Sequence, residues 1–250
     1  MQILKLGGSA ITRKSGYMQA DLPAIASLAR AVGSAKKQGA GELVIVHGAG
    51  SFGHAPVLKY GLENGVKTAR QKEGCKITQQ ACACLSYHVV FALSQAGVKA
   101  VSIPPHNMIV SKNGRIAKLN YAPIAAALKS GCVPVLYGDM VPDLKLGFSV
   151  CSGDQMISRL ACKAKKVVMA TNVDGVMACR KLVPRITRTN FASVARHITG
   201  SREPDVTGGM AGKLREIMKC RTPAYIVNAK KPARVLALLL GKKAVSTRVN

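Results

Sequence analysis

Short apolar runs that alternate with amphipathic stretches predict an α/β fold built around a mainly parallel sheet. The strand-like runs lie at residues 2–6, 43–46, 98–103, 133–137, 166–170 and 224–228. Helical spacing of apolar residues separates most of these runs, at residues 21–38, 76–96, 121–130, 154–164, 210–219 and 232–241. Strands that are apolar throughout and alternate with helices are typical of this fold class.

The helix expected at residues 21–38 has the clearest start signal. Asp21 stands where an N-cap is expected, and Pro23 lies in the first turn. Its apolar residues repeat with helical spacing, at Leu22, Ile25, Leu28, Ala29 and Val32. Two later helices each show one apolar face, from Met156 to Leu160 and from Met210 to Ile217.

Length and composition predict one globular unit. The chain has 250 residues, of which 48% are hydrophobic, and this content is ample for a core. We find no long linker, repeat or low-complexity tract, so we expect a single domain with two lobes that divide near residue 150. The longest aliphatic stretch, 235–240, is far below the roughly 20 residues that a membrane-spanning helix needs. Without a recognisable signal peptide, we expect a cytoplasmic protein.

The eight cysteines form no metal-binding or disulfide pattern. They include no C-x-x-C pair, so we expect them to be reduced and mostly buried. The histidines at 88, 106 and 197 also lack the spacing of metal ligands, and His47 is expected to lie at a strand end.

The charge balance is strongly basic. Lysine and arginine number 37 against 11 aspartate and glutamate, which leaves a net charge of +26. Such a field attracts phosphates, nucleic acids and anionic membranes. However, the basic residues are dispersed, and few aromatic residues could stack on bases. Four of the scarce acids lie near glycines in turn-like contexts, namely Asp139, Asp154, Asp174 and Asp205.

Three glycine loops point to phosphate chemistry. The first, KLGGSAITRK, runs from Lys5 to Lys14 and places paired glycines between two lysines. The second, HGAGSFGH at residues 47–54, follows a buried strand, and its glycines permit left-handed backbone and close approach of N–H groups to an anion. The third, DVTGGMAGK at residues 205–213, puts Lys213 in the first turn of a helix, where a cation is unfavourable unless an anion is bound.

Two common nucleotide-binding motifs are excluded. The third loop fails the Walker A pattern because Gly212-Lys213 is followed by Leu214. Gly48, Gly50 and Gly53 match G-x-G-x-x-G, but no acid stands at a strand end about 20 residues later, as a dinucleotide site requires.

Together these loops, with SGDQ at 152–155 and NVDGV at 172–176, resemble the amino acid kinase superfamily. The SFGH and DVTGG segments resemble its isopentenyl phosphate kinase branch in particular, and fosfomycin kinases share much of the pattern. The resemblance runs over nearly the whole chain. Relatives often differ at three positions of this chain, Arg13, Ala49 and Asn172.

The resemblance implies an open αβα sandwich, usually a homodimer, that phosphorylates isopentenyl phosphate with ATP and Mg²⁺ in isoprenoid biosynthesis. It places Lys5 and Lys213 beside the transferred phosphoryl group and gives Asp154 the role of orienting these lysines. His54 matches a histidine that binds the acceptor phosphate. By the same resemblance, residues 1–150 form the acceptor lobe and residues 151–250 the nucleotide lobe.

The other positions carried over from the family contact the nucleotide or the acceptor. The nucleotide positions are Gly7, Gly8, Ser9, Lys14, Thr171, Asp174, Gly175, Val176, Asp205, Gly208 and Gly209. The acceptor positions are Gly48, Ala49, Gly50, Gly53 and Gly138, together with His54. No protein ligand for magnesium is assigned. The apolar face of the helix at 76–96 fits either a prenyl pocket or plain core packing, through Ala81, Leu85, Val89 and Phe91.

Two other functions fit the same residues. A kinase of another small phosphate or phosphonate, such as fosfomycin, would use the same nucleotide site. A basic nucleic-acid-binding protein on a kinase scaffold would account for the charge, but the retention of Lys5, His54, Asp154 and Lys213 together argues against it.

Overall fold

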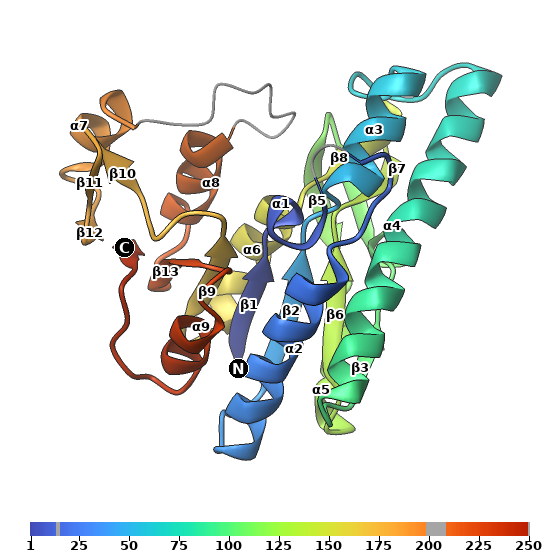
Figure 1. Ribbon diagram of the computed structural model, residues 1–250. Coiled ribbons are helices and arrows are strands. Elements are labelled where there is room, and N and C mark those ends of the chain that lie inside the picture. Colours follow the sequence, from blue (N-terminus) through green and yellow to red (C-terminus); the bar gives the residue numbers. More distant parts are fainter. Residues whose placement is uncertain (14–15, 199–208, 250) are drawn as a thin grey trace.

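The computed structural model describes residues 1–13, 16–198 and 209–249, and in these residues a central sheet of eight strands organises the chain (Figure 1). Its order is β12-β14-β13-β9-β1-β2-β6-β3, and all neighbouring pairs are parallel except β13 with β14. The strands are β1 (Gln2–Leu6), β2 (Leu43–His47), β3 (Ala100–Ser102), β6 (Val133–Tyr137), β9 (Val167–Thr171), β12 (Arg185–Ile186), β13 (Ala224–Asn228) and β14 (Thr247–Val249).

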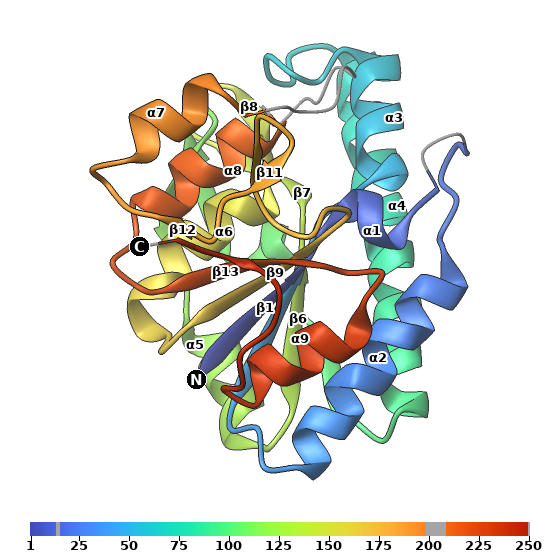
Figure 2. The ribbon, with the colours of Figure 1, turned by 60° about the vertical axis from the view of Figure 1, so that its left-hand side comes forward.

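Helices cover both faces of this sheet, which confirms the predicted αβα sandwich (Figure 2). One face packs against α2 (Leu22–Lys37), α4 (Ala69–Gln95) and α9 (Pro232–Leu239). The other face packs against α5 (Ala122–Lys129), α6 (Gly153–Leu160) and α8 (Gly209–Met218). Because successive side chains of a strand point to opposite faces, Leu4 joins the first core and Ile3 the second. Lys5 follows Leu4 and therefore points to the face that α6 covers.

A smaller sheet and several short elements complete the structure. The described residues form a four-stranded sheet in the order β5-β4-β7-β8, with strands β4 (Ile109–Lys112), β5 (Arg115–Leu119), β7 (Asp139–Asp143) and β8 (Gly147–Cys151). A hairpin pairs β10 (Met177–Ala178) with β11 (Lys181–Leu182). The remaining helices are α1 (Gly8–Ile11), α3 (Ser51–Tyr60), α7 (Phe191–Arg196) and the 3₁₀ turns η1 (Pro105–Asn107) and η2 (Ala161–Lys163).

Every predicted strand and helix is present, with changed bounds in some cases. The Asp21 side chain accepts a hydrogen bond from the N–H of Ala24, so the expected N-cap is confirmed. In contrast, α4 begins seven residues earlier than the predicted residue 76, because Thr68 and Gln71 form a capping box there. The strand expected at 98–103 is shorter, and the helix expected at 154–164 ends at Leu160 and continues as η2.

Two features of the fold differ from the expectations, namely the length of the second glycine loop and the presence of a second, smaller sheet. In the HGAGSFGH segment only residues 48–50 form a loop, because β2 ends at His47 and α3, which includes Gly53 and His54, begins at Ser51. The small sheet was not predicted at all. The central sheet continues across the expected lobe boundary near residue 150, since β9 pairs directly with β1.

The cysteines are free, but the expectation that most are buried is wrong. Cys75, Cys82 and Cys151 are buried, whereas the rest are partly or fully exposed, at Cys84, Cys132, Cys162, Cys179 and Cys220. In the described part of the chain, no helix combines the length and the apolar character that crossing a bilayer requires.

Candidate active site

The first two glycine loops meet backbone to backbone at the carboxyl ends of β1 and β2. A Cβ atom on Gly8 would lie 2.5 Å from the amide nitrogen of Gly50, and one on Gly48 would lie 2.6 Å from the amide nitrogen of Gly8. No larger residue fits at either position without moving a backbone. Of the three glycines in the second loop, only Gly50 is left-handed, with φ of 52°. Close approach therefore explains these glycines better than unusual torsion angles.

Thr12 joins these two loops. It lies within the first loop segment, KLGGSAITRK, but its role was not predicted. Its hydroxyl donates to the carbonyl of Gly8 at 2.9 Å and accepts from the N–H of Ser51 at 3.2 Å. Thr12 is buried, and it borders the same cavity as the glycines. The threonine thus fixes the start of α3 against the loop that follows β1.

Lys5 and Asp154 form a buried ion pair between the sheet and α6. Lys5 is only 4% exposed and Asp154 only 7%. The Lys5 ammonium donates a hydrogen bond to the Asp154 carboxylate. Ser152 caps α6 by accepting from the N–H of Gln155, which holds Asp154 in the first turn of the helix. Since β1 is central and Lys5 is buried, a solvated lysine on an edge strand is excluded.

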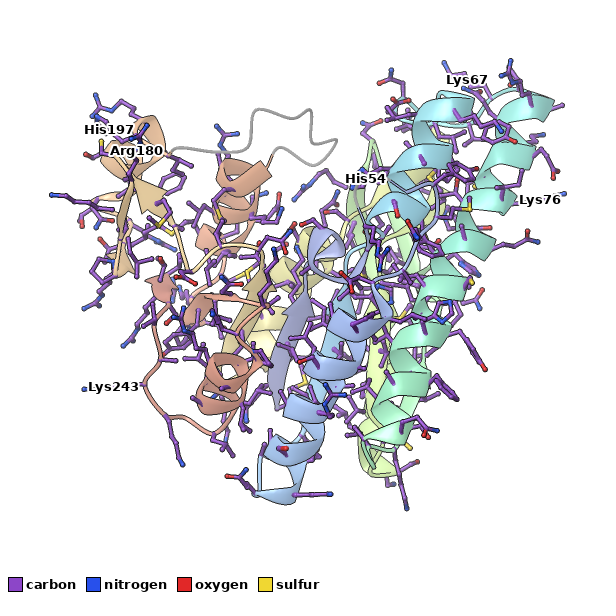
Figure 3. The ribbon with its side chains drawn as sticks, in the orientation of Figure 1. His54, Lys67, Lys76, Arg180, His197 and Lys243 are labelled. Atoms are coloured by element: carbon purple, nitrogen blue, oxygen red, sulfur yellow. The ribbon has the colours of Figure 1, made fainter. Side chains whose placement is uncertain are left out.

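A cavity of about 340 Å³ lies where these elements meet, and we call it the central cavity. This volume falls within the range of small-molecule sites. It brings together Lys5, Asp154, Lys213 and His54, which come from β1, α6, α8 and α3. Figure 3 labels His54 on α3. The predicted glycine positions Gly7, Gly8, Gly48, Gly50, Gly53 and Gly138, together with Ser9 and Ala49, line the same cavity.

One part of the central cavity is apolar. Its side chains come from α3, α4, β7 and β8, and they are Val57, Leu58, Thr78, Cys82, Met140, Val150 and Cys151. The helix α4 therefore reaches the cavity, but not through the residues suggested by its apolar pattern. Ala81, Leu85 and Val89 are packed in the core, and Phe91 is 52% exposed.

Comparisons with known proteins show the family and the fold of the chain. Residues 1–228 match the model of the amino acid kinase family. The chain belongs to the amino acid kinase family. The isopentenyl phosphate kinase of Methanothermobacter thermautotrophicus is 37% identical over 100% of this chain and 98% of its own length. That of Methanocaldococcus jannaschii is 32% identical over 97% of this chain and 96% of its own.

Solved structures of this family superpose over the full chain. One described as X-ray structures of isopentenyl phosphate kinase has a TM-score of 0.85 and 34% identity, with 100% of both chains covered. An isopentenyl phosphate kinase substrate complex has a TM-score of 0.77 and 27% identity, also with 100% of both chains covered. The fold and the order of its elements are therefore those of the family.

Only some of the positions that the family resemblance assigns to the nucleotide line the central cavity. Thr171, Lys5 and Lys213 border a small void beside it. Asp174 accepts hydrogen bonds from Asn228 and Arg234, each at 2.8 Å, and the hydrogen bond from Asn228 is the main reason that its pKa is lowered.

Two further nucleotide positions pack against β14. Val176 is fully buried and donates its N–H to the Thr247 hydroxyl at 2.7 Å, and a Cβ on Gly175 would lie 2.5 Å from the same hydroxyl. Gly209 begins α8. Lys14, Asp205 and Gly208 lie outside the described residues.

Two of the other histidines, His47 and His106, are held by contacts with neighbouring side chains. Burial lowers the pKa of His47 to about 4, and its ring stacks on Tyr137 at 5.5 Å. His106 contacts the buried carboxylate of Asp139 at 2.7 Å. Burial raises the pKa of Asp139, and the hydrogen bond to Asp139 raises the pKa of His106. Within the described ranges, no three histidine, cysteine or acidic side chains cluster as metal ligands would.

Proposed function

We propose that the protein is an ATP-dependent isopentenyl phosphate kinase, which forms isopentenyl diphosphate for isoprenoid biosynthesis. The observation that carries the proposal is the central cavity itself. It has lysines and glycine amides at one part and an apolar wall at another. A phosphate carrying a short hydrocarbon tail has the same division between charged and apolar surface.

Two lysines would stabilise the transferred phosphoryl group. The acceptor phosphate has a second pKa of about 6, so at neutral pH it is a nucleophile without a general base. One of its oxygens forms a bond to the γ-phosphorus of ATP while the bond to the ADP oxygen breaks, and no proton has to move. The main cost is bringing two anions together, which Lys5, Lys213 and the amides of Gly7 and Gly8 would offset. Asp154 would orient the lysines.

The acceptor would lie between the second glycine loop and the apolar wall. His54 would hydrogen-bond the acceptor phosphate, with backbone contacts from Gly48, Ala49, Gly50, Gly53 and Gly138. The tail would contact the apolar side chains of α3, α4, β7 and β8 that line the cavity. Cys82 and Cys151 suit this role, because burial raises the pKa of both thiols and keeps them neutral.

The nucleotide would occupy the side of the cavity formed by residues after 150, as the family resemblance implies. Its proposed contacts are Ser9, Lys14, Thr171, Asp174, Gly175, Val176, Asp205, Gly208 and Gly209. The described residues provide no carboxylate cluster for a protein-held magnesium ion. We therefore infer that Mg²⁺ enters with the ATP phosphates, and we assign no step to it.

We further infer that the protein is a cytoplasmic homodimer. Next to β3, which ends the central sheet in the described chain, lies an exposed apolar surface. Tyr87 is 64% exposed, Phe91 52% and Val101 39%, and the rings of Tyr87 and Phe91 stack at 6.1 Å. Neighbouring exposed apolar groups of this kind mark association surfaces. Sedimentation velocity tests the dimer, and a monomer at micromolar concentration contradicts it.

A coupled assay of ADP release tests the proposed function. Isopentenyl phosphate, dimethylallyl phosphate, fosfomycin and UMP are compared as acceptors at equal concentration. We expect the highest kcat/KM with isopentenyl phosphate, because UMP has no apolar tail and fosfomycin a much smaller one. Preference for fosfomycin would favour the alternative phosphonate kinase.

The same preparation also tests the nucleic-acid alternative. Tight, salt-dependent RNA binding without phosphoryl transfer would favour a binding protein. The dispersed surface cations argue against this outcome, since Lys67 and Lys76 project on one side of the molecule, whereas Arg180 and Lys243 project on the opposite side (Figure 3).

A further inference from the structure

A bidentate ion pair connects α8, the helix that carries Lys213, to the small sheet. Glu216 lies on α8 one turn after Lys213. Its carboxylate accepts from both terminal nitrogens of Arg115, Nη1 to Oε1 at 2.8 Å and Nη2 to Oε2 at 3.0 Å. Arg115 is the first residue of β5. The contact therefore joins segments that are 101 residues apart in the sequence.

The turn that precedes Arg115 is itself anchored to α6. The side-chain amide of Gln155 donates to the carbonyl of Gly114 at 3.1 Å, and Gln155 follows Asp154 directly. The carboxylate of Asp143 accepts from the N–H groups of Asn113 and Gly114 at 3.1 and 2.7 Å. The turn between β4 and β5 is thus held from two sides, and it presents Arg115 from a fixed position.

We propose that Arg115 is a positioning residue that, through Glu216, holds α8 so that Lys213 faces the Lys5–Asp154 pair across the central cavity. The route runs from Asp154 through Gln155 and the β4–β5 turn to Arg115, and then to Glu216 on α8. The inference rests on the proposed function, because it gives Lys213 a part in phosphoryl transfer.

Apolar packing alone does not fix α8 in this way. Leu214 and Ile217 are buried and set the depth of the helix against the core. Apolar contacts are non-directional, whereas a planar guanidinium that meets both oxygens of a carboxylate fixes direction as well as distance. Lys5 and Lys213 line the same cavity, so the direction of α8 sets where the Lys213 ammonium lies relative to the Lys5–Asp154 pair.

The scarcity of acidic residues supports a specific structural role for Glu216. The chain has only 11 acidic residues against 37 basic ones, and α8 carries a single acid among its residues 209–218. The Glu216 side chain is 14% exposed, although the Arg115 side chain is 52% exposed. Burial raises the pKa of Glu216, but the hydrogen bonds from Arg115 and Lys219 outweigh it and hold the pKa at about 2.

Arg115→Met tests the proposal, with Lys219→Met as the matched control. Lys219 also contacts Glu216 at 2.8 Å and is equally exposed, but it belongs to the same segment and links α8 to nothing else. For Arg115→Met we expect kcat to fall about 10-fold, in keeping with a small displacement of a catalytic group, while KM for isopentenyl phosphate stays within about 2-fold. Arg115→Lys keeps the charge but cannot donate two parallel hydrogen bonds, so its kcat should lie between those of Arg115→Met and the unmodified protein. Lys219→Met should keep its kcat.

A second measurement separates positioning from general destabilisation. In a Lys213→Arg background, Arg115→Met should cause little further loss of kcat, because both changes act through the same ammonium group. A full additional 10-fold loss would overturn the proposal, and so would an unchanged kcat in the single variant.

Hydrogen exchange of α8 distinguishes failure of this inference from failure of the proposed function. Arg115→Met should speed amide exchange in residues 209–218 relative to Lys219→Met, and equal rates would overturn the anchoring. If the unmodified protein transfers no phosphoryl group to isopentenyl phosphate, the proposed function falls, and the exchange rates still decide whether Arg115 anchors α8.

Discussion

Replacing Asp154 tests the buried ion pair at the centre of the site. In Asp154→Asn, the ammonium of Lys5 stays buried but loses the carboxylate that it contacts. Removing one member of a buried pair costs about 3–5 kcal/mol in stability. For a domain of this length, the lower figure corresponds to a melting temperature lower by roughly 6–12 °C. Turnover should fall by about 100-fold, because the lysines lose their orienting group.

Thermal unfolding followed by circular dichroism, with the coupled kinase assay beside it, measures both effects. Asp174→Asn is the control for stability, since Asp174 is 45% exposed and solvent screens its pair with Arg234, so this variant should melt close to the unmodified protein. The double variant Lys5→Met/Asp154→Asn should regain stability relative to Asp154→Asn, but not turnover. An Asp154→Asn protein that melts within 2 °C of the unmodified one and keeps its turnover refutes the reasoning.

Two further predictions concern the acceptor and acid stability. His54→Ala should lower kcat/KM for isopentenyl phosphate about 10- to 100-fold, the value of one hydrogen bond to a charged group, while KM for ATP stays unchanged; equal damage to both substrates would contradict its role. Burial raises the pKa of Asp143, but N–H donors from Lys145, Gly114 and Leu146 outweigh it and lower the pKa to about 2. Because the pKa is lower in the folded protein, the ionised Asp143 carboxylate contributes about 2 kcal/mol to the free energy of unfolding above pH 4, and this contribution is lost as the pH falls to 2. In urea unfolding, the difference in unfolding free energy between Asp143→Asn and the unmodified protein should therefore shrink by about 2 kcal/mol between pH 5 and pH 2. A difference that stays constant over this pH range would contradict the prediction.

The local signals of the sequence were sufficient for the central sheet and most of its helices. Asp21 and the spacing after it marked α2, and the apolar run before His47 marked β2. Some missed elements also had signals. Thr68 and Gln71 have the spacing of a capping box, and Asn113-Gly114 between two short runs is a strong hairpin signal. Both central residues of that turn are left-handed, with φ of 51° and 71°.

Other features of the site depend on contacts that no local pattern contains. The motifs placed Lys5, His54, Asp154 and Lys213 near phosphate, but nothing in the residues around Thr12 indicates that its hydroxyl joins two loops. The pair of Arg115 and Glu216 spans 101 residues and becomes visible only when β5 and α8 are side by side. The apolar face of α4 was also ambiguous, because a core and a pocket select the same residue types. The structure places Ala81, Leu85 and Val89 in the core, and two other residues of α4, Thr78 and Cys82, at the cavity.

Phosphorus NMR of ATP and isopentenyl phosphate, incubated with the protein or with its Lys213→Met variant, tests the central claim most directly. The account predicts that the unmodified protein produces the paired resonances of isopentenyl diphosphate along with ADP. The variant should produce neither, although its circular dichroism spectrum is unchanged. Diphosphate formed at a similar rate by the folded variant, or none formed by the unmodified protein, would contradict the claim that the Lys213 ammonium stabilises phosphoryl transfer in this cavity.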